Sequence, residues 1–302
     1  MPWLAMVSLM TGCCTYNNIA PFPKTEKPVT ISIGKGSFSV QQALILGTYY
    51  DEPNHIIITG FQNQNGVIGG ALLGPLGMLV TDSAGRLYAK EKFGANSDKM
   101  AMDLGKLTQD ILTQELAAHP VALVSKVVPD SGDVVITPFA VFSVGDAKTA
   151  RLYVLLEVEM PDPGKDPKWS GRYFARAPGE YLIEGKNGWL AADRFSDGIR
   201  LAMQRDLTVL LKEIQRELTA SHKVKAIGQY PFGNAMGNDF GGDFEIPFVL
   251  VDEERDYVVG RLVAPDGVSQ AGTHILNRAD YQFVDVNFNM PKGIYHVSYR
   301  SP

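Results

Sequence analysis

The clearest hydrophobic pattern in this chain is a series of strand-length runs in its middle third. The runs VALVSKVV, DVVITPFAVFSV and ARLYVLLEVEM are rich in β-branched and aromatic residues, which predicts consecutive strands. Shorter runs predict further strands at 29–33 and 55–61. Pro138 lies inside the second long run, and proline cannot donate a hydrogen bond to a sheet. We therefore expect that strand to be an edge strand or to bulge at this point.

The runs on either side of the segment PDPGKDPK predict a hairpin, because that segment is dense in turn-forming residues. If the loop is centred near residues 164–165, Glu157 lies opposite Arg172 and Leu156 lies opposite Tyr173. Opposite charges then share one face and apolar pairs share the other. Agreement between the two faces predicts a single register for the hairpin.

Two helices are predicted from apolar residues spaced at the helical period. The first is expected to begin near Lys99 with Ser97 or Asp98 as its cap, and to end before Pro120. The second and longer helix begins after Asp193, a candidate cap. Its apolar stripe contains Phe195, Ile199, Met203, Leu207, Leu210, Ile214 and Leu218. We expect the opposite, charged face of this helix to contact water.

The order of these elements predicts an α+β fold with a mixed sheet packed by helices over residues 29–226. Residues 227–243 are rich in Gly, Asn and Asp, which is typical of a linker. Beyond them, short apolar runs separated by turn residues predict a small β-sandwich at 244–302. Strands are expected there at 245–251, 257–264, 281–288 and 294–299.

The two cysteines of the chain are adjacent, at positions 13 and 14, so a structural disulfide does not explain them. They follow an apolar, uncharged segment, Trp3 to Gly12, which is too short to span a bilayer. Small residues directly before Cys13 are typical of a cleaved secretory signal. The alternative is an unstructured N-terminus with two idle cysteines.

The stretch Met10-Thr11-Gly12-Cys13 resembles the lipobox of bacterial lipoproteins. The resemblance implies that Cys13 receives a diacylglycerol, that residues 1–12 are a signal segment, and that 13–28 are a lipidated tether. Met10 replaces the usual Leu and no basic segment precedes it, so we expect a start codon upstream. Since Cys14 is not the Asp that retains such proteins in the inner membrane, the family pattern implies a periplasm-facing anchor in the outer membrane.

A net charge of −5, with Lys and Arg spread along the chain, gives no basic patch for nucleic acid, and none is expected as a partner. Gly66, Gly70 and Gly74 recur every fourth residue in an apolar stretch, which on a helix lets another backbone approach closely. Either this segment packs within the fold, or it contacts the membrane or a second copy of the chain.

Two fainter resemblances rest on pattern alone. The order of elements in the first domain is similar to that of periplasmic α/β domains of envelope lipoproteins, such as the curli-secretion group. The segments VGRLVAPDG at 259–267 and PKGIYHV at 291–297 resemble transthyretin-like and carboxypeptidase-regulatory-like domains. Members of that second group are generally spacers or binding modules, and Gly260 and Gly293 are then expected to meet backbone requirements.

Motifs for catalysis are not found. The histidines, at 55, 119, 222, 274 and 296, have no metal-ligand spacing, so no metal or other cofactor is predicted. GEYLIEGKNG lacks the spacing of a phosphate loop. Glu157 and Glu159 would be an acid/base pair only if Arg172 and Arg176 were not their partners. Asp239, Asp243 and Glu245 could hold Ca²⁺, but their spacing does not fit an EF-hand and favours a solvated linker.

Two classes of function follow from this sequence. The first is a lipid-anchored cell-envelope protein that binds an envelope protein partner, as a non-catalytic assembly or transport-accessory factor. The alternative is a periplasmic hydrolase whose catalytic carboxylates have no recognisable spacing, since active sites assemble from distant segments. A cleft with converging titratable groups would favour the alternative.

Overall fold

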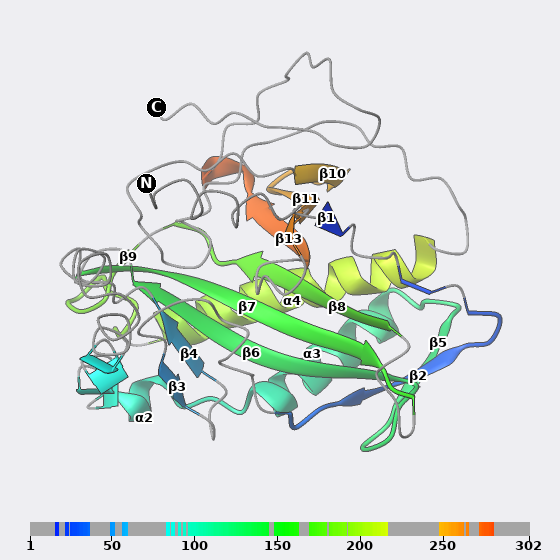
Figure 1. Cartoon of the computed structure of the whole chain (residues 1–302), viewed down its shortest axis with the longest axis horizontal. Coiled ribbons are helices and arrows are strands. Elements are labelled where there is room, and N and C mark those ends of the chain that lie inside the picture. The colour runs from blue at the N-terminus through cyan, green and yellow to red at the C-terminus, as the bar shows by residue number, and fades with distance from the viewer. Residues whose placement is uncertain are drawn as a thin grey trace, which may run out of the picture.

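The computed structural model (Figure 1) describes much of the chain between residues 16 and 280. The described residues are 16–17, 22–23, 25–36, 49–51, 56–59, 83–84, 86–87, 90–91, 93–94, 96–144, 148–162, 169–179, 181–191, 193–216, 248–262, 264–265 and 272–280.

In this part of the chain, one sheet of eleven strands has the principal order β10-β11-β13-β8-β7-β6-β2-β5. Its strands are β2 (Val29–Ile33), β3 (Tyr49–Asp51), β4 (Ile56–Thr59), β5 (Val124–Val127), β6 (Val134–Val144), β7 (Thr149–Met160), β8 (Trp169–Arg176), β9 (Tyr181–Leu182), β10 (Phe248–Glu253), β11 (Tyr257–Leu262) and β13 (Gly272–Asn277). Parallel pairs, such as β2 with β6, occur beside antiparallel ones, such as β6 with β7. The predicted α+β fold with a mixed sheet packed by helices is confirmed.

The register of the β7–β8 hairpin is the predicted one. Glu157 pairs with Arg172 and Leu156 pairs with Tyr173 across the two strands. Arg172 Nε donates to Glu157 Oε1 at 3.1 Å, so the charges form the expected cross-strand contact. Leu156 and Tyr173 are buried in the core on the other face. Burial of both faces therefore fixes this register.

The position of Pro138 corrects one prediction. Its strand, β6, lies between β7 and β2 in the sheet and is not an edge strand. Proline is accommodated because β6 changes its parallel partner at this point. Residues 134–136 of β6 pair with β2 and residues 140–143 pair with β4, so Pro138 falls between the two ladders.

The predicted first helix is divided into two. A single turn, α2 (Ser97–Met100), precedes α3 (Leu104–Ala118), and residues 101–103 separate them. The cap of α3 is Asp103, whose side chain accepts a hydrogen bond from the Lys106 backbone N–H at 2.8 Å. The predicted caps, Ser97 and Asp98, instead lie inside α2, so the prediction placed the start of the long helix too early.

The second helix, α4 (Arg194–Arg216), begins at the predicted position after Asp193. Both α3 and α4 lie on one face of the sheet, behind β6, β7 and β8 in Figure 1. The predicted apolar stripe of α4 is buried from Phe195 to Ile214, while Leu218 lies outside the described residues. Packing of this stripe on β7 and β8 forms the centre of the core.

Part of the predicted C-terminal region extends the same sheet. Strands β10 and β11 overlap two predicted strands, and β13 pairs in parallel with β8 through Thr273, His274 and Ile275. Strand β13 itself was not predicted, and a 3-10 helix, η2 (Arg278–Asp280), follows it. The strands expected at 281–288 and 294–299, and the linker at 227–243, lie outside the described residues. The division into domains therefore stays a prediction.

The segment expected to be a tether contacts the folded part of the chain. Strand β1 (Tyr16–Asn17) pairs with β12 (Ala264–Pro265). Phe22 is buried and packs edge-to-face on Trp169, with ring centroids 5.0 Å apart. If Cys13 carries a lipid, the spacer between the lipid and the fold ends before Phe22.

Candidate functional site

A pocket lies where β9, α2 and the N-terminal end of α4 meet. The loop that follows β9 forms one wall, and backbone hydrogen bonds hold its two sides together. Trp189 N–H donates to Leu182 O at 2.8 Å, and Leu190 N–H donates to Ile183 O at 3.0 Å. The indole N–H of Trp189 donates to Ala150 O of β7 at 2.7 Å. This wall is therefore fixed to the central sheet.

Two glycines allow the tight path of this loop. Gly185 has φ of 94°, a left-handed conformation that residues with a side chain rarely adopt. A Cβ atom at Gly188 would lie 2.5 Å from the carbonyl oxygen of Glu184, so no larger residue fits without a backbone shift. Residues 183–188 of the segment GEYLIEGKNG, which does not match a phosphate loop, thus form a compact turn in the pocket wall.

The start of α4 supplies the opposite wall. Asp193 adopts a left-handed conformation with φ of 64°, which Asp tolerates better than most residues, and its carbonyl accepts the first helical hydrogen bond from Asp197 N–H at 2.7 Å. Phe195 turns into the core and packs on Phe142 of β6, with ring centroids 5.8 Å apart. The helix start is therefore held by the same sheet as the loop.

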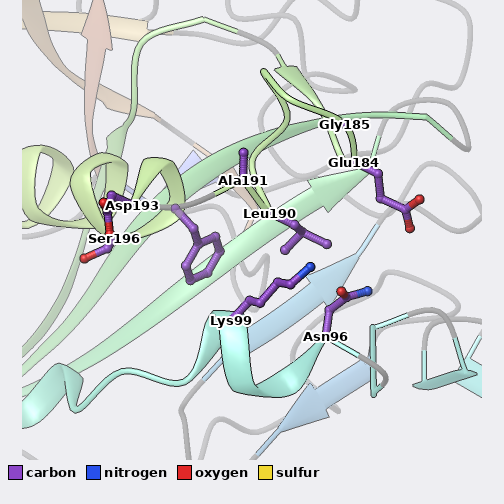
Figure 2. Close-up of a pocket in the computed structure, with 9 residues that line it drawn as sticks. Asn96, Lys99, Glu184, Gly185, Leu190, Ala191, Asp193 and Ser196 are labelled. Carbon is purple, nitrogen blue, oxygen red and sulfur yellow. The ribbon is translucent and has the colours of Figure 1, made fainter.

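The pocket has a volume of about 790 Å³. Its lining consists of Asn96, Lys99, Glu184, Gly185, Leu190, Ala191, Asp193, Phe195 and Ser196. Leu190 and Phe195 are buried and apolar. Figure 2 shows Lys99 extending from α2 toward Leu190, with Glu184 on one side and Asp193 and Ser196 on the other. A cation and two carboxylates thus surround an apolar floor.

Two further carboxyl groups lie inside the fold, on α4. The face of this helix opposite its apolar stripe is exposed, as predicted, at Arg194, Asp197, Arg200 and Gln204. Asp206 and Glu213 are both buried, at 0% and 3% exposure. The two residues are seven positions apart, so they lie on one face of the helix. That face packs on β8 and β13, which explains why it is not solvated.

The described residues give the buried carboxyl group of Asp206 no charged partner. No well-aligned hydrogen bond from the described residues reaches either of its oxygens. Burial raises the pKa of Asp206 well above its usual range, and the backbone N–H of Ala175 opposes this shift. The carboxyl group is therefore held in its neutral form over a wider pH range than an exposed Asp.

Glu213, by contrast, belongs to a polar contact between α4 and the strands. Tyr173 of β8 donates its hydroxyl to Glu213 Oε2 at 2.6 Å, and Thr273 Oγ1 of β13 lies 3.5 Å from Oε1. Nearby, Asn277 accepts from Arg205 and donates to the Arg176 carbonyl at 3.1 Å. We name Tyr173, Glu213, Thr273, Arg205 and Asn277 the polar seam. It connects β13 to α4 and β8.

The residues predicted to form functional sites are mostly outside the described part of the chain. Cys13, Gly66, Gly70, Gly74 and the carboxylates at 239, 243 and 245 all lie there. Glu157 does contact Arg172, and burial raises the pKa of Glu157 while Arg172 opposes the shift. No three potential metal ligands cluster within the described ranges. Those ranges also contain no helix of the length and apolarity needed to cross a bilayer.

The comparisons with known proteins give no relative. No family model, curated protein or solved structure matches this chain.

Proposed function

We propose that this chain is a lipid-anchored cell-envelope protein that binds a protein partner as a non-catalytic assembly or transport-accessory factor. The anchor is Cys13 in the lipobox-like segment, and the membrane is the outer membrane, with the fold facing the periplasm. Attachment through two or more acyl chains would be stable without a transmembrane helix.

The observation that carries the binding role is the pocket between the loop after β9 and the start of α4. Both walls are hydrogen-bonded or packed onto the central sheet. A pocket with fixed walls loses little conformational entropy when it binds, which favours recognition. Its volume of about 790 Å³ lies within the usual range of ligand sites.

One observation favours the hydrolase as a second candidate, because Glu184 and Asp193 place two carboxylates in the same pocket. Both side chains are exposed, however. Catalytic acids are typically desolvated in a cleft, where burial tunes their protonation. The exposure of both groups favours a binding role over an acid/base role.

Two further parts of the proposal concern regions wholly or partly outside the described residues. We propose that residues 244–302, which include β10, β11 and β13, form a β-sandwich-like module. The glycine series Gly66, Gly70 and Gly74 is proposed as a close-packing segment that serves assembly or membrane contact, including contact between copies of the chain.

A photo-cross-linking residue tests the binding role in cells. Placed at Lys186, which is exposed in the loop beside the pocket, it should give a discrete cross-linked partner. Placed at Lys126, which is exposed on β5, it should not. The product should also disappear in the Cys13→Ser variant, which is not anchored. Equal products from both positions, or none from Lys186, would contradict a partner at this pocket.

A further inference from the structure

The charges of the pocket define the kind of ligand that it can hold. Lys99 comes from α2, whereas Glu184 and Asp193 come from the loop and the start of α4. Within the described residues, no ion pair links Lys99 to either carboxylate. All three charged groups are exposed and therefore accessible to a ligand.

A ligand with a single kind of charge would meet repulsion in this pocket. A phosphate-like anion near Lys99 would also lie near two carboxylates, and a simple cation near the carboxylates would also lie near Lys99. A ligand that carries both charges can place each beside its opposite. Complementary charges of this kind determine specificity more than affinity.

The remaining lining suits a polypeptide. Leu190 and Phe195 line the pocket and are 6% and 3% exposed, so they offer a small apolar surface against which an aliphatic side chain can pack. The hydroxyl of Ser196 is a group that can hydrogen-bond to a peptide main chain. The volume of about 790 Å³ accommodates a short peptide.

We propose that the pocket binds the C-terminal end of a partner polypeptide. Its α-carboxylate contacts Lys99, its last side chain is aliphatic and packs on Leu190 and Phe195, and a basic side chain beside it contacts Glu184. This inference rests on the proposed binding function and specifies the chemistry of the partner.

Titration of the full chain, purified in detergent, with three peptides tests this proposal. The probe is acetyl-Ala-Lys-Leu with a free carboxylate. One comparison peptide has a C-terminal amide, and the other has norleucine in place of Lys. Each removes one charge and keeps the apolar contacts. We expect the free-acid probe to bind at least about fivefold more tightly than either comparison peptide.

Two variants assign the charges to the residues. Lys99→Gln should weaken binding of the free-acid probe to the affinity of the amide peptide, and it should leave the affinity of the amide peptide unchanged. Glu184→Gln should remove the preference for Lys over norleucine. Lys126→Gln and Glu159→Gln, which remove exposed charges outside the pocket, serve as matched controls and should change nothing. Such paired changes isolate each contact in a double-mutant cycle.

Three results would overturn the proposal: no binding of the probe, equal binding of the acid and the amide, or equal effects of the pocket variants and the controls. Binding of inorganic phosphate in competition with the probe would also overturn it, because it would identify an anion site. A partner cross-linked at Lys186 together with a failed titration would leave the proposed function standing and refute only the ligand class.

Discussion

Asp206 shows how a single residue can depart from its expected place in a helix. The apolar period predicts that Ile199, Met203 and Leu210 are buried, whereas residue type predicts that the charged residues of this helix contact water. The spacing from Met203 to Asp206 and from Asp206 to Leu210 nevertheless places this carboxyl inside the same stripe. The position of Asp206 in the helical period therefore predicts its burial, whereas its residue type predicts exposure, and the structure shows it buried.

Replacing Asp206 tests how much its buried carboxyl group lowers the free energy of unfolding. Because the folded-state pKa of Asp206 is raised, its contribution to stability is fully present below the unfolded-state pKa and is lost as pH rises toward the folded-state pKa. Asp206→Asn, which cannot ionise, should therefore raise the free energy of unfolding at pH 7 by about 1–3 kcal/mol. The gain should shrink toward pH 4. Urea unfolding at the two pH values measures both.

The control for this variant is Asp197→Asn on the same helix, where the side chain is exposed. Surface substitutions usually change stability by less than about 0.5 kcal/mol. A pH-independent effect of Asp206→Asn, or an equal effect of Asp197→Asn, would show that ionisation of the buried group is not the cause.

The half-buried pair Glu157 and Arg172 gives a second prediction. Since Arg172 opposes the raised pKa of Glu157, Arg172→Met should raise that pKa further. The free energy of unfolding should fall by about 1–2 kcal/mol at pH 7. This loss lies between those typical of exposed and of buried ion pairs. Below about pH 4, where Glu157 is protonated in both states, the loss should be smaller.

The measurement is urea unfolding at pH 7 and pH 3.5, with Arg200→Met as the control because Arg200 is an exposed Arg on α4. If Arg172→Met costs the same at both pH values, the side chain acts through packing and the charge pair contributes little.

Among the elements, strand register was easier to predict than helix boundaries. The β7–β8 register followed from alternating side chains, because burial of both faces permits only one pairing. The break between α2 and α3 was missed, because the apolar period continues from Met100 to Leu104 across it. A period alone carries no information about where the backbone hydrogen bonds stop.

The start of α3 can be tested through its cap. Asp103→Ala removes the side chain that accepts from Lys106 N–H, and it should lower the free energy of unfolding by about 1 kcal/mol. Asp98→Ala, which removes the cap predicted from sequence, should be close to neutral. Thermal unfolding compares the two variants. A larger loss for Asp98→Ala would place the helix start where the sequence pattern put it.

For the whole molecule, the sheet could be predicted but the pocket could not. The apolar runs identify most strands. Strand β13 instead carries the polar residues Thr273, His274 and Asn277, and it joins the sheet because it pairs with β8 and makes the contacts of the polar seam. The pocket combines α2, a glycine-containing turn and a helix start that are far apart in sequence. Convergence of this kind depends on tertiary packing, which no local pattern records.

Truncation after residue 243 tests how the C-terminal segment relates to the rest. It removes β10, β11 and β13, so it leaves the edge of β8 and the Glu213 side chain without their contacts to β13. We expect the truncated chain to melt at a lower temperature than the full chain. An unchanged melting temperature would instead support two independent domains, as the sequence predicts.

The proposed membrane anchor at Cys13 is tested by metabolic labelling with a clickable fatty acid. The wild-type chain and Cys14→Ser should incorporate the label and fractionate with membranes. Cys13→Ser should remain unlabelled, as an unprocessed precursor. Equal labelling of the wild-type chain and Cys13→Ser would show that Cys13 is not the site of lipid attachment.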